Sequence, residues 1–234
     1  MGIAEKNHCT VRGYLSLLPL LAAVFMPANA TAVTFQVEIS DAIYQVQAAD
    51  TYADLLFQHQ AANLLSSNIV PGIVGITAPI EAGVNADYSM LVTTVLDISV
   101  AGTYEFQMGT DWGLGGASVI IDNADGSIVD QFVTTQNVWW NNNWNDPDVF
   151  SSLVTLDAGS SYTLAWVGFE DCCGGSASIR FSYNGGAFSS FTESGIAPFV
   201  SNPEPGTGLL VALGLGMMSG ARRRRQPNAK RRQN

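Results

Sequence analysis

The sequence has little charge, and positive charge is almost absent from the middle of the chain. Charged residues make up 13% of the 234 residues, about half the roughly 25% of an ordinary soluble protein. Nine of the ten basic residues lie near the two ends, and Arg180 is the exception. Eighteen of the twenty acidic residues lie within positions 31–202, so this section carries a net charge of −17. Such a surface repels nucleic acid and anionic membranes, which excludes both as partners of the middle section.

Residues that commonly carry catalysis are scarce as well. The middle section has a single histidine, His59, and neither a Gly-x-Ser-x-Gly nor a His-Glu-x-x-His motif. A pair of carboxylates can hydrolyse sugars, but eighteen acidic residues offer such a pair in many places. We therefore expect a protein that is not an enzyme, with a carboxylate-dependent glycoside hydrolase as the less favoured alternative.

Cysteine is nearly absent, since Cys9 lies close to the N-terminus and only Cys172 and Cys173 lie further along. Free thiols do not persist well in an oxidising compartment, and Gly174 and Gly175 give the backbone the freedom that a ring between neighbours needs. Cys172 and Cys173 are therefore candidates for a local disulfide. Bridges to another chain, and reduced thiols with a metal or redox role, stay open as alternatives.

The N-terminus has the order of a secretory signal peptide. Lys6 and Arg12 precede an apolar run over 14–26, which ends at Pro27 and the small-residue pattern Ala28-Asn29-Ala30. This order is typical of a helical signal peptide that is cut after a small residue. We expect signal peptidase to remove residues 1–30, or to cut two residues further on after Ala32, and the rest of the chain to be exported.

The C-terminus reads as a short membrane segment. An apolar stretch over 207–221 is followed at once by four arginines. A helix over 207–221 spans only about 22 Å, whereas the hydrocarbon core is about 30 Å thick. The arginines favour the cytoplasmic side of the membrane. On composition alone, this segment is a marginal anchor that stops translocation.

The motifs of this tail resemble a known sorting signal. The tail combines a proline-bounded triplet, the Gly-rich apolar stretch and the arginine cluster; the residues concerned are Pro203, Glu204, Pro205, Arg222, Arg223, Arg224 and Arg225. In this order they resemble the PEP-CTERM signal of Gram-negative bacteria, over residues 201–234. The segment Cys172–Gly175 is similar to a Cys-Cys-x-Gly motif that marks a group of such proteins.

The resemblance to PEP-CTERM proteins implies a route through the cell envelope. An exosortase, a membrane transpeptidase, would cleave near the triplet and pass the protein from the inner membrane to the cell surface or extracellular matrix. The chain would then contact the membrane only through the C-terminal hydrophobic helix, before that cleavage.

The middle of the chain is dominated by short apolar segments separated by turn residues. Turn chemistry occurs at Asp125-Gly126, Ala158-Gly159 and Asn184-Gly185-Gly186. The segments between such turns predict nine strands, at 33–37, 43–46, 88–100, 102–108, 117–122, 128–134, 150–156, 161–169 and 176–183. Several short strands at this spacing indicate an all-β sandwich, for which a jelly roll is one arrangement. We expect this secreted domain to cover residues 31–200.

Segment 50–66 differs from its surroundings. Thr51 and Asp54 resemble a capping box, and the apolar residues from Tyr52 onward roughly follow helical spacing. The sequence therefore predicts one short helix within the sandwich.

Two pairs of sequence segments in the middle section resemble those of a sugar-binding fold. Segment 100–106 leads into Asp111 and 119–122, and segment 155–164 leads into 177–183. This order is similar to the jelly-roll sugar-binding domains named after the anthrax protective antigen, over about 100 residues. Those domains carry paired acids where this chain has Asp111-Trp112. The resemblance implies a jelly roll and makes Asp111 a candidate ligand-binding residue.

A second candidate site combines aromatic and amide side chains. Trp139, Trp140 and Trp144 surround three consecutive asparagines. Sugars offer apolar C–H faces rimmed by hydroxyls, which suit such a combination. In the alternative interpretation, the tryptophans fill the core of the sandwich while the asparagines form a turn.

Calcium is the one cofactor for which the sequence offers candidate ligands. Asp122 and Asp125 lie in the segment Asp122-Asn123-Ala124-Asp125-Gly126, which has the oxygen-rich composition of a calcium loop but lacks the later glutamate of an EF-hand. A hairpin turn that ends in Asp-Gly explains the same residues equally well.

Taken together, these features predict an exported, non-catalytic protein of the cell surface or extracellular matrix. Extracellular polysaccharide is the candidate ligand of its β-sandwich, on the strength of the tryptophan segment and Asp111. A purely structural or adhesive component without a ligand is the alternative.

Overall fold

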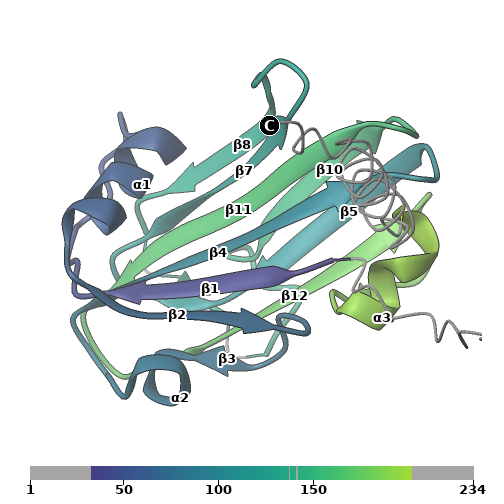
Figure 1. Cartoon of the computed structure of the whole chain (residues 1–234). Coiled ribbons are helices and arrows are strands. Elements are labelled where there is room, and N and C mark those ends of the chain that lie inside the picture. Colours follow the sequence, from purple (N-terminus) through teal and green to yellow (C-terminus); the bar gives the residue numbers. More distant parts are fainter. Residues whose placement is uncertain (1–32, 137, 141, 202–234) are drawn as a thin grey trace, which may run out of the picture.

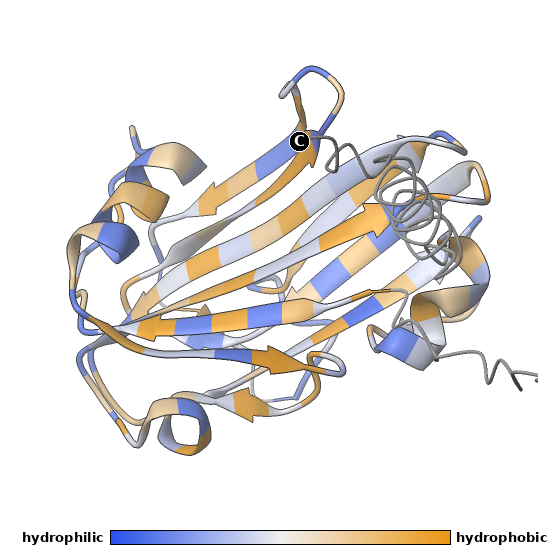
Figure 2. Cartoon of the chain, viewed as in Figure 1, coloured by the Kyte–Doolittle hydropathy of each residue, from blue (hydrophilic) through white to orange (hydrophobic). Residues whose placement is uncertain are grey.

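Strand β10 (Phe150–Leu156) illustrates how this sequence forms its sheets. Phe150, Val154 and Leu156 are buried, whereas Ser151 and Leu153 are exposed. Successive side chains of a strand point to opposite faces, so this alternation buries one face of the strand and leaves the other in water. Figure 2 shows the same alternation as orange bands separated by paler or blue bands along several strands.

Two packed antiparallel sheets make up the part of the chain that the computed structural model describes, residues 33–136, 138–140 and 142–201 (Figure 1). The larger sheet has six strands in the order β2 (Leu64–Val70), β1 (Phe35–Ser40), β4 (Tyr88–Asp97), β11 (Ser161–Glu170), β7 (Gly116–Asp122) and β8 (Ile128–Thr134). The smaller sheet has the order β10, β5 (Gly102–Gly109), β12 (Ser176–Tyr183) and β13 (Ser189–Ser190). Short strand β3 (Ile76–Thr77) pairs with β12, and β6 (Asp111–Trp112) pairs with β9 (Val138–Trp139).

The main core lies between the two sheets and is rich in aromatic rings. Phe106 of β5 and Phe181 of β12 meet Phe191 with ring centroids 5.5 and 5.8 Å apart. Phe35 of β1 reaches Phe191 from the larger sheet in an edge-to-face contact of 4.8 Å. Such aromatic contacts hold the two sheets together through a few large buried side chains.

A second core covers the outer face of the larger sheet. Helix α1 (Tyr52–Ala61) packs Leu55 against this face, where Val119, Val167 and Phe169 are also buried. Strand β11 is therefore buried on both faces along most of its length. The remaining helices are short: α2 (Ala78–Ala82), α3 (Glu193–Ile196) and the 3₁₀ helix η1 (Ala197–Phe199). Within the described ranges, no helix has the length and apolar character needed to cross a membrane.

The described chain enters and leaves the sandwich at the same end. Phe35, at the start of β1, pairs with Thr94 near the end of β4. Ser201 donates its backbone N–H to the carbonyl of Asp97, the last residue of β4. The loops between β5 and β7, between β9 and β10, and between β11 and β12 lie at the opposite end. Asp111, Trp140, Trp144 and the Cys172–Cys173 pair lie at or near this opposite end, whereas Asp122 and Asp125 lie in the β7–β8 hairpin at the end where the chain enters.

The all-β sandwich with a short helix is confirmed. Strands β8, β10 and β12 begin and end at the residues that the sequence predicts. The capping box of α1 is also present, since Asp54 N–H donates to Thr51 Oγ1 and Thr51 N–H donates to the Asp54 carboxylate. The predicted signal helix over 1–30 and the C-terminal hydrophobic helix lie outside the described residues.

Two local predictions are wrong. Segment 43–46 is not a strand. It belongs to a loop whose alternate residues Ala42, Tyr44 and Val46 pack against the outer face of the larger sheet, and the Val46 backbone N–H donates to the carbonyl of Leu114.

The predicted helix over 50–66 ends at Ala61, and residues from Leu64 onward form β2. This strand lies at the edge of the sheet, and its half-buried positions include the polar Ser66 and Asn68 while Ile69 is exposed. Its sequence therefore lacks the alternation of apolar and polar residues that identifies a strand.

Candidate functional site

The segment 142–149, which we call the tryptophan loop, lies over the outer face of the smaller sheet. Trp140 precedes it and anchors its start: the Trp140 N–H donates to the carbonyl of Thr110, and its ring packs on Gly109, where a Cβ would overlap it. Trp144 then meets Trp140 edge-to-face, with ring centroids 4.6 Å apart. Glycine at position 109 is therefore what lets the indole of Trp140 lie flat against β5.

Arg180 extends from the outer face of β12 between two aromatic rings. Its guanidinium carbon lies 4.3 Å from the ring centroid of Trp144 and 4.0 Å from that of Phe188. Both distances are within the range of a cation–π contact. Partial burial lowers the pKa of Arg180, and the charge of Glu105 opposes that shift.

A chain of hydrogen bonds fixes the orientation of the guanidinium. Arg180 Nε donates to Gln107 Oε1 at 2.8 Å, and Gln107 Nε2 donates to Glu105 Oε1 at 2.7 Å. Ser151 Oγ donates to the same carboxylate oxygen at 3.3 Å. The three strands β12, β5 and β10 therefore cooperate to hold Arg180, because these side chains share the outer face of the smaller sheet.

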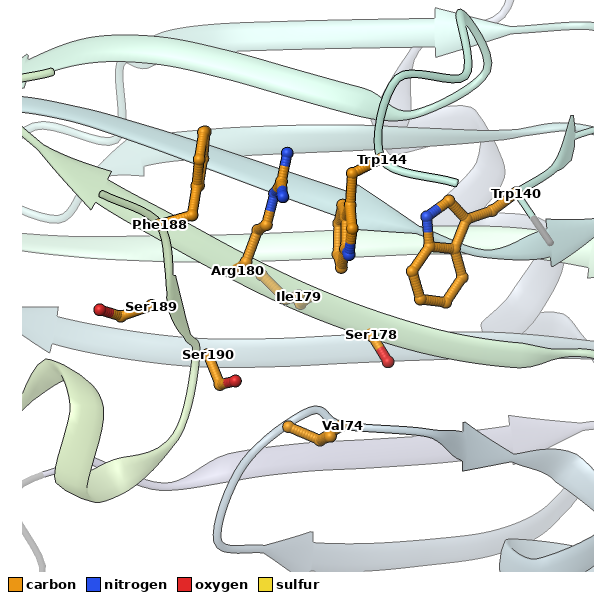
Figure 3. Close-up of a pocket in the computed structure, with 9 residues that line it drawn as sticks. All are labelled: Val74, Trp140, Trp144, Ser178, Ile179, Arg180, Phe188, Ser189 and Ser190. Carbon is orange, nitrogen blue, oxygen red and sulfur yellow. The ribbon is translucent and has the colours of Figure 1, made fainter. Parts of the chain in front are cut away.

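These side chains line a pocket of about 270 Å³, which we call the arginine pocket. Figure 3 shows Phe188, Arg180, Trp144 and Trp140 in a row, with Val74 and the serines of β12 and β13 beside them. Its residues are Val74, Trp140, Trp144, Ser178, Ile179, Arg180, Phe188, Ser189 and Ser190. The volume lies just below the roughly 300–1,000 Å³ of pockets for drug-sized ligands, so the arginine pocket suits one sugar-sized unit.

A group of carboxylates lies at the loop end of the sandwich, and we call Asp111, Glu170 and Asp171 the carboxylate cluster. Glu170 is 2% exposed, and its two oxygens accept the backbone N–H groups of Gly113 and Cys172 at 2.7 and 2.8 Å. Burial raises the pKa of Glu170, the two backbone hydrogen bonds oppose this, and the charges of Asp111 and Asp171 add to it. Burial also raises the pKa of Asp111.

Cys172 and Cys173 are joined by a disulfide next to the carboxylate cluster. Cys173 and Gly174 both have positive φ, of 67° and 51°, a conformation that glycine adopts at little cost. The resulting turn directs the Cys172 N–H at Glu170. The disulfide loop and the buried carboxylate therefore form one local unit.

The carboxylate cluster is a poor donor set for a metal ion. Oxygens of Glu170 and Asp171 and the sulfur of Cys172 lie within 4.8 Å of one another. That sulfur is engaged in the disulfide, and metals bind the thiolate. Calcium prefers six to eight oxygen ligands, and Glu170 already accepts two backbone hydrogen bonds. The residues present therefore do not fit a calcium site there.

The predicted calcium loop forms the hairpin turn between β7 and β8. Asp122 Oδ1 accepts the N–H of Ala124 and Asp125 Oδ1 accepts the N–H of Ser127, both at 2.8 Å. The bond from Ser127 lowers the pKa of Asp125. These carboxylates serve the turn, and calcium binding at Asp122 and Asp125 stays a prediction.

A buried polar cluster, which the sequence analysis missed, joins α1 to the larger sheet. His59 Nδ1 lies 2.6 Å from Ser89 Oγ, which lies 2.7 Å from Ser40 Oγ. His59 Nε2 lies 3.7 Å from a carboxylate oxygen of Glu38. A serine, a histidine and a carboxylate are the residue types of a nucleophilic triad. Ser89 is fully buried, however, so a substrate cannot reach its hydroxyl and this cluster stabilises the fold.

The candidate ligand residues divide between two places. The structure brings Trp140 and Trp144 to the arginine pocket, whereas Asp111 packs on Gly175 beside the carboxylate cluster. The sequence analysis missed Arg180 and Phe188 as partners of the tryptophans. The one available signal was that Arg180 is the lone basic residue of the middle section. The side chain of Trp139 and the predicted sorting signal (Pro203, Glu204, Pro205 and Arg222 to Arg225) lie outside the described residues.

Comparisons with known proteins give similarities of limited extent. No family model matches the chain, and no curated protein does. The chain is similar to a PA14 sugar-binding domain from an RTX adhesin, with 18% identity over 72% of this chain and 98% of that one and a TM-score of 0.43. It is also similar to the PA14 domain of the antifreeze protein MpAFP, with 12% identity over 74% and 93% and a TM-score of 0.47.

A further similar structure is the A domain of epithelial adhesin 9 from Candida glabrata in complex with Galb1-3GlcNAc. Its identity is 11% over 76% of this chain and 94% of that one, with a TM-score of 0.45. At such low TM-scores, the function of this chain has to be judged from its own site. The fold and the arginine pocket define it as a β-sandwich domain with an aromatic pocket on one outer face.

Proposed function

We propose that this chain is an exported, non-catalytic protein of a bacterial surface or extracellular matrix, and that its sandwich binds polysaccharide through the arginine pocket. The observation that carries the proposal is the row of Phe188, Arg180, Trp144 and Trp140 beside an open pocket of about 270 Å³. Aromatic side chains in a shallow pocket with serine hydroxyls match the mixed apolar and polar surface of a sugar.

The structure around the row supports a preformed site. Trp140 is 4% exposed and locked on Gly109, and Arg180 is held by Gln107. A site whose side chains are already fixed loses little conformational entropy on binding. In contrast, Trp144 and Phe188 stay partly exposed at the rim, where a ligand can reach them.

Replacing Trp144 with alanine tests this proposal. We expect the variant to bind extracellular polysaccharide of the host about tenfold more weakly or worse, because an aromatic contact and the stacking of Arg180 are both lost. Affinity electrophoresis through gels that contain a panel of neutral and acidic polysaccharides gives the measurement, with circular dichroism to check folding.

Phe57→Ala is the matched control for Trp144→Ala. Phe57 is an aromatic residue of α1 with 67% exposure, and it lies on the outer side of the larger sheet rather than in the arginine pocket. The control should bind like the wild type. If the wild type binds no polysaccharide of the panel, the proposal is wrong and a purely structural or adhesive role is favoured.

Export and sorting form the second element of the proposal. We expect the mature protein isolated from its host to begin near Thr31 and to end near Pro203–Pro205, because signal peptidase and an exosortase remove the two ends. Mass spectrometry of the intact protein measures both ends. On reduction, the mass should also increase by that of two hydrogens, through opening of the Cys172–Cys173 disulfide. An intact arginine-rich C-terminus would contradict exosortase processing.

A further inference from the structure

In the part of the chain that the structure describes, the arginine pocket contains a cation without a direct ion pair, since the nearby Glu105 reaches Arg180 only through Gln107. Arg180 is the single basic residue of the described section, which holds eighteen acidic residues. Among these described residues, no carboxylate oxygen lies within 4.0 Å of its guanidinium nitrogens. Its Nε is bonded instead to the neutral amide of Gln107. A partly buried charge is costly unless it is paired, and Arg180 therefore has the capacity to pair directly with a negative charge that a ligand brings.

The two aromatic rings determine how that charge can approach. Trp144 and Phe188 cover the guanidinium with ring centroids 4.3 and 4.0 Å from its central carbon. The planar guanidinium carries five N–H donors in its plane, and the bond to Gln107 uses the one on Nε. The donors that remain lie along an edge whose geometry matches a carboxylate.

The rest of the pocket has the chemistry of a sugar site rather than of a simple anion site. Ser189 and Ser190 are exposed on β13 and offer hydroxyl groups. Trp144 lines the pocket and offers apolar aromatic surface to the C–H groups of a sugar ring. The volume of about 270 Å³ accommodates one such unit.

We propose that the arginine pocket binds an acidic sugar unit, a uronic acid whose carboxylate pairs edge-on with Arg180. This inference rests on the proposed polysaccharide binding and narrows its ligand class. Trp144, Ser189 and Ser190 then contact the ring and hydroxyls of the same unit.

The negative charge of the domain restricts which acidic saccharides it can bind. The net charge of −17 over positions 31–202 repels a densely charged polyanion. A single acidic unit on a neutral chain experiences less of this repulsion, since salt screens charges beyond about 8 Å at physiological ionic strength. The ligand class is therefore a largely neutral polysaccharide with sparse uronic acid branches.

The test compares three probes on the wild-type protein by isothermal titration calorimetry. They are a xylo-oligosaccharide with one glucuronic acid branch, the methyl ester of that branch, and the unbranched oligosaccharide. We expect the acid to bind about tenfold to a hundredfold more tightly than the ester, because the ester carries no negative charge and cannot form an ion pair with Arg180. Since the ester changes only the ligand, the result does not depend on the folding of a variant.

Arg180→Gln and Arg180→Lys complete the experiment, with near-ultraviolet circular dichroism as a check of packing. Arg180→Gln should bind acid and ester equally weakly, and Arg180→Lys should recover part of the preference because it restores charge but not the bidentate edge.

The outcomes separate this inference from the proposed function. Equal binding of acid, ester and unbranched probe overturns the inference and leaves polysaccharide binding intact. If none of the three probes binds but other polysaccharides of the gel panel do, the inference is again overturned and polysaccharide binding stays intact. If no saccharide binds at all, the proposed function fails, and the inference fails with it.

Discussion

Replacing Trp112 with alanine is expected to lower the free energy of unfolding by about 3–5 kcal/mol. The Trp112 side chain is 1% exposed and meets Phe150 edge-to-face at 5.6 Å. Its ring also lies on Gly116 and Gly168, where a Cβ would overlap it. Alanine would leave a cavity that these glycines cannot fill. Chemical denaturation of the wild type and the variant measures the difference.

The loss expected for Trp112→Ala is large against the roughly 5–15 kcal/mol by which domains are stable. Leu153→Ala is the control, because Leu153 is 69% exposed on β10 and its loss should change stability by about 0.5 kcal/mol or less. If Trp112→Ala lowers the free energy of unfolding no more than this control does, then the ring does not fill the space beside Gly116, Gly168 and Phe150.

The second expected result is a loss of stability on acidification that depends on His59. Burial lowers the pKa of His59 from its ordinary value of 6.5, and Glu38 opposes this in part. The native state therefore takes up a proton less readily than the unfolded chain. Protonation favours unfolding, so stability should decrease as the pH falls below about 6.5. Denaturation at pH 7.5 and at pH 5.5 measures this change.

His59→Gln is the variant that isolates this effect. Gln cannot be protonated, so the variant should lose less stability between the two pH values, whatever its stability at pH 7.5. Glu170 and Asp111 act in the opposite direction, because their raised pKa values let the native state hold protons that the unfolded chain releases. These carboxyl groups are common to both proteins and cancel in the comparison. Equal pH slopes would contradict a buried, neutral His59.

The sequence predicts strands well where one face is buried and the other is wet. Strand β10 is the clearest case, since its alternation determines both of its ends. Strand β2 was missed because its apolar residues do not follow its burial: Ser66 and Asn68 occupy half-buried positions, whereas Ile69 is exposed. Segment 43–46 was misassigned because a loop that packs on a sheet also alternates. An alternating sequence shows which residues are buried. Strands and the loops that cover a sheet both bury alternate residues, so the pattern alone does not distinguish them.

The candidate site was predictable only in part, because its residues come from distant segments. Composition alone marks Trp140 and Trp144 as candidates. Arg180 and Phe188 follow them by roughly forty residues, and only the pairing of β12 with β5 brings them under the tryptophan loop. Asp111 was a candidate through the resemblance to sugar-binding jelly rolls, and its side chain lies against Gly175, away from the arginine pocket. Sheet pairing, which no local pattern encodes, decides these positions.

The entry and exit of the chain at one end of the sandwich determine how the domain is presented. Strands β4 and β11 have ten residues each, so about 30 Å separates that end from the loops at the other. An attachment beyond Ser201 leaves the tryptophan loop on the side away from the attachment point. Neighbouring molecules fixed to one support would then expose their pockets in a common layer, and a single long polymer lying along that layer would engage several of them at once. Weak binding to each pocket would become strong retention of the polymer through multivalency.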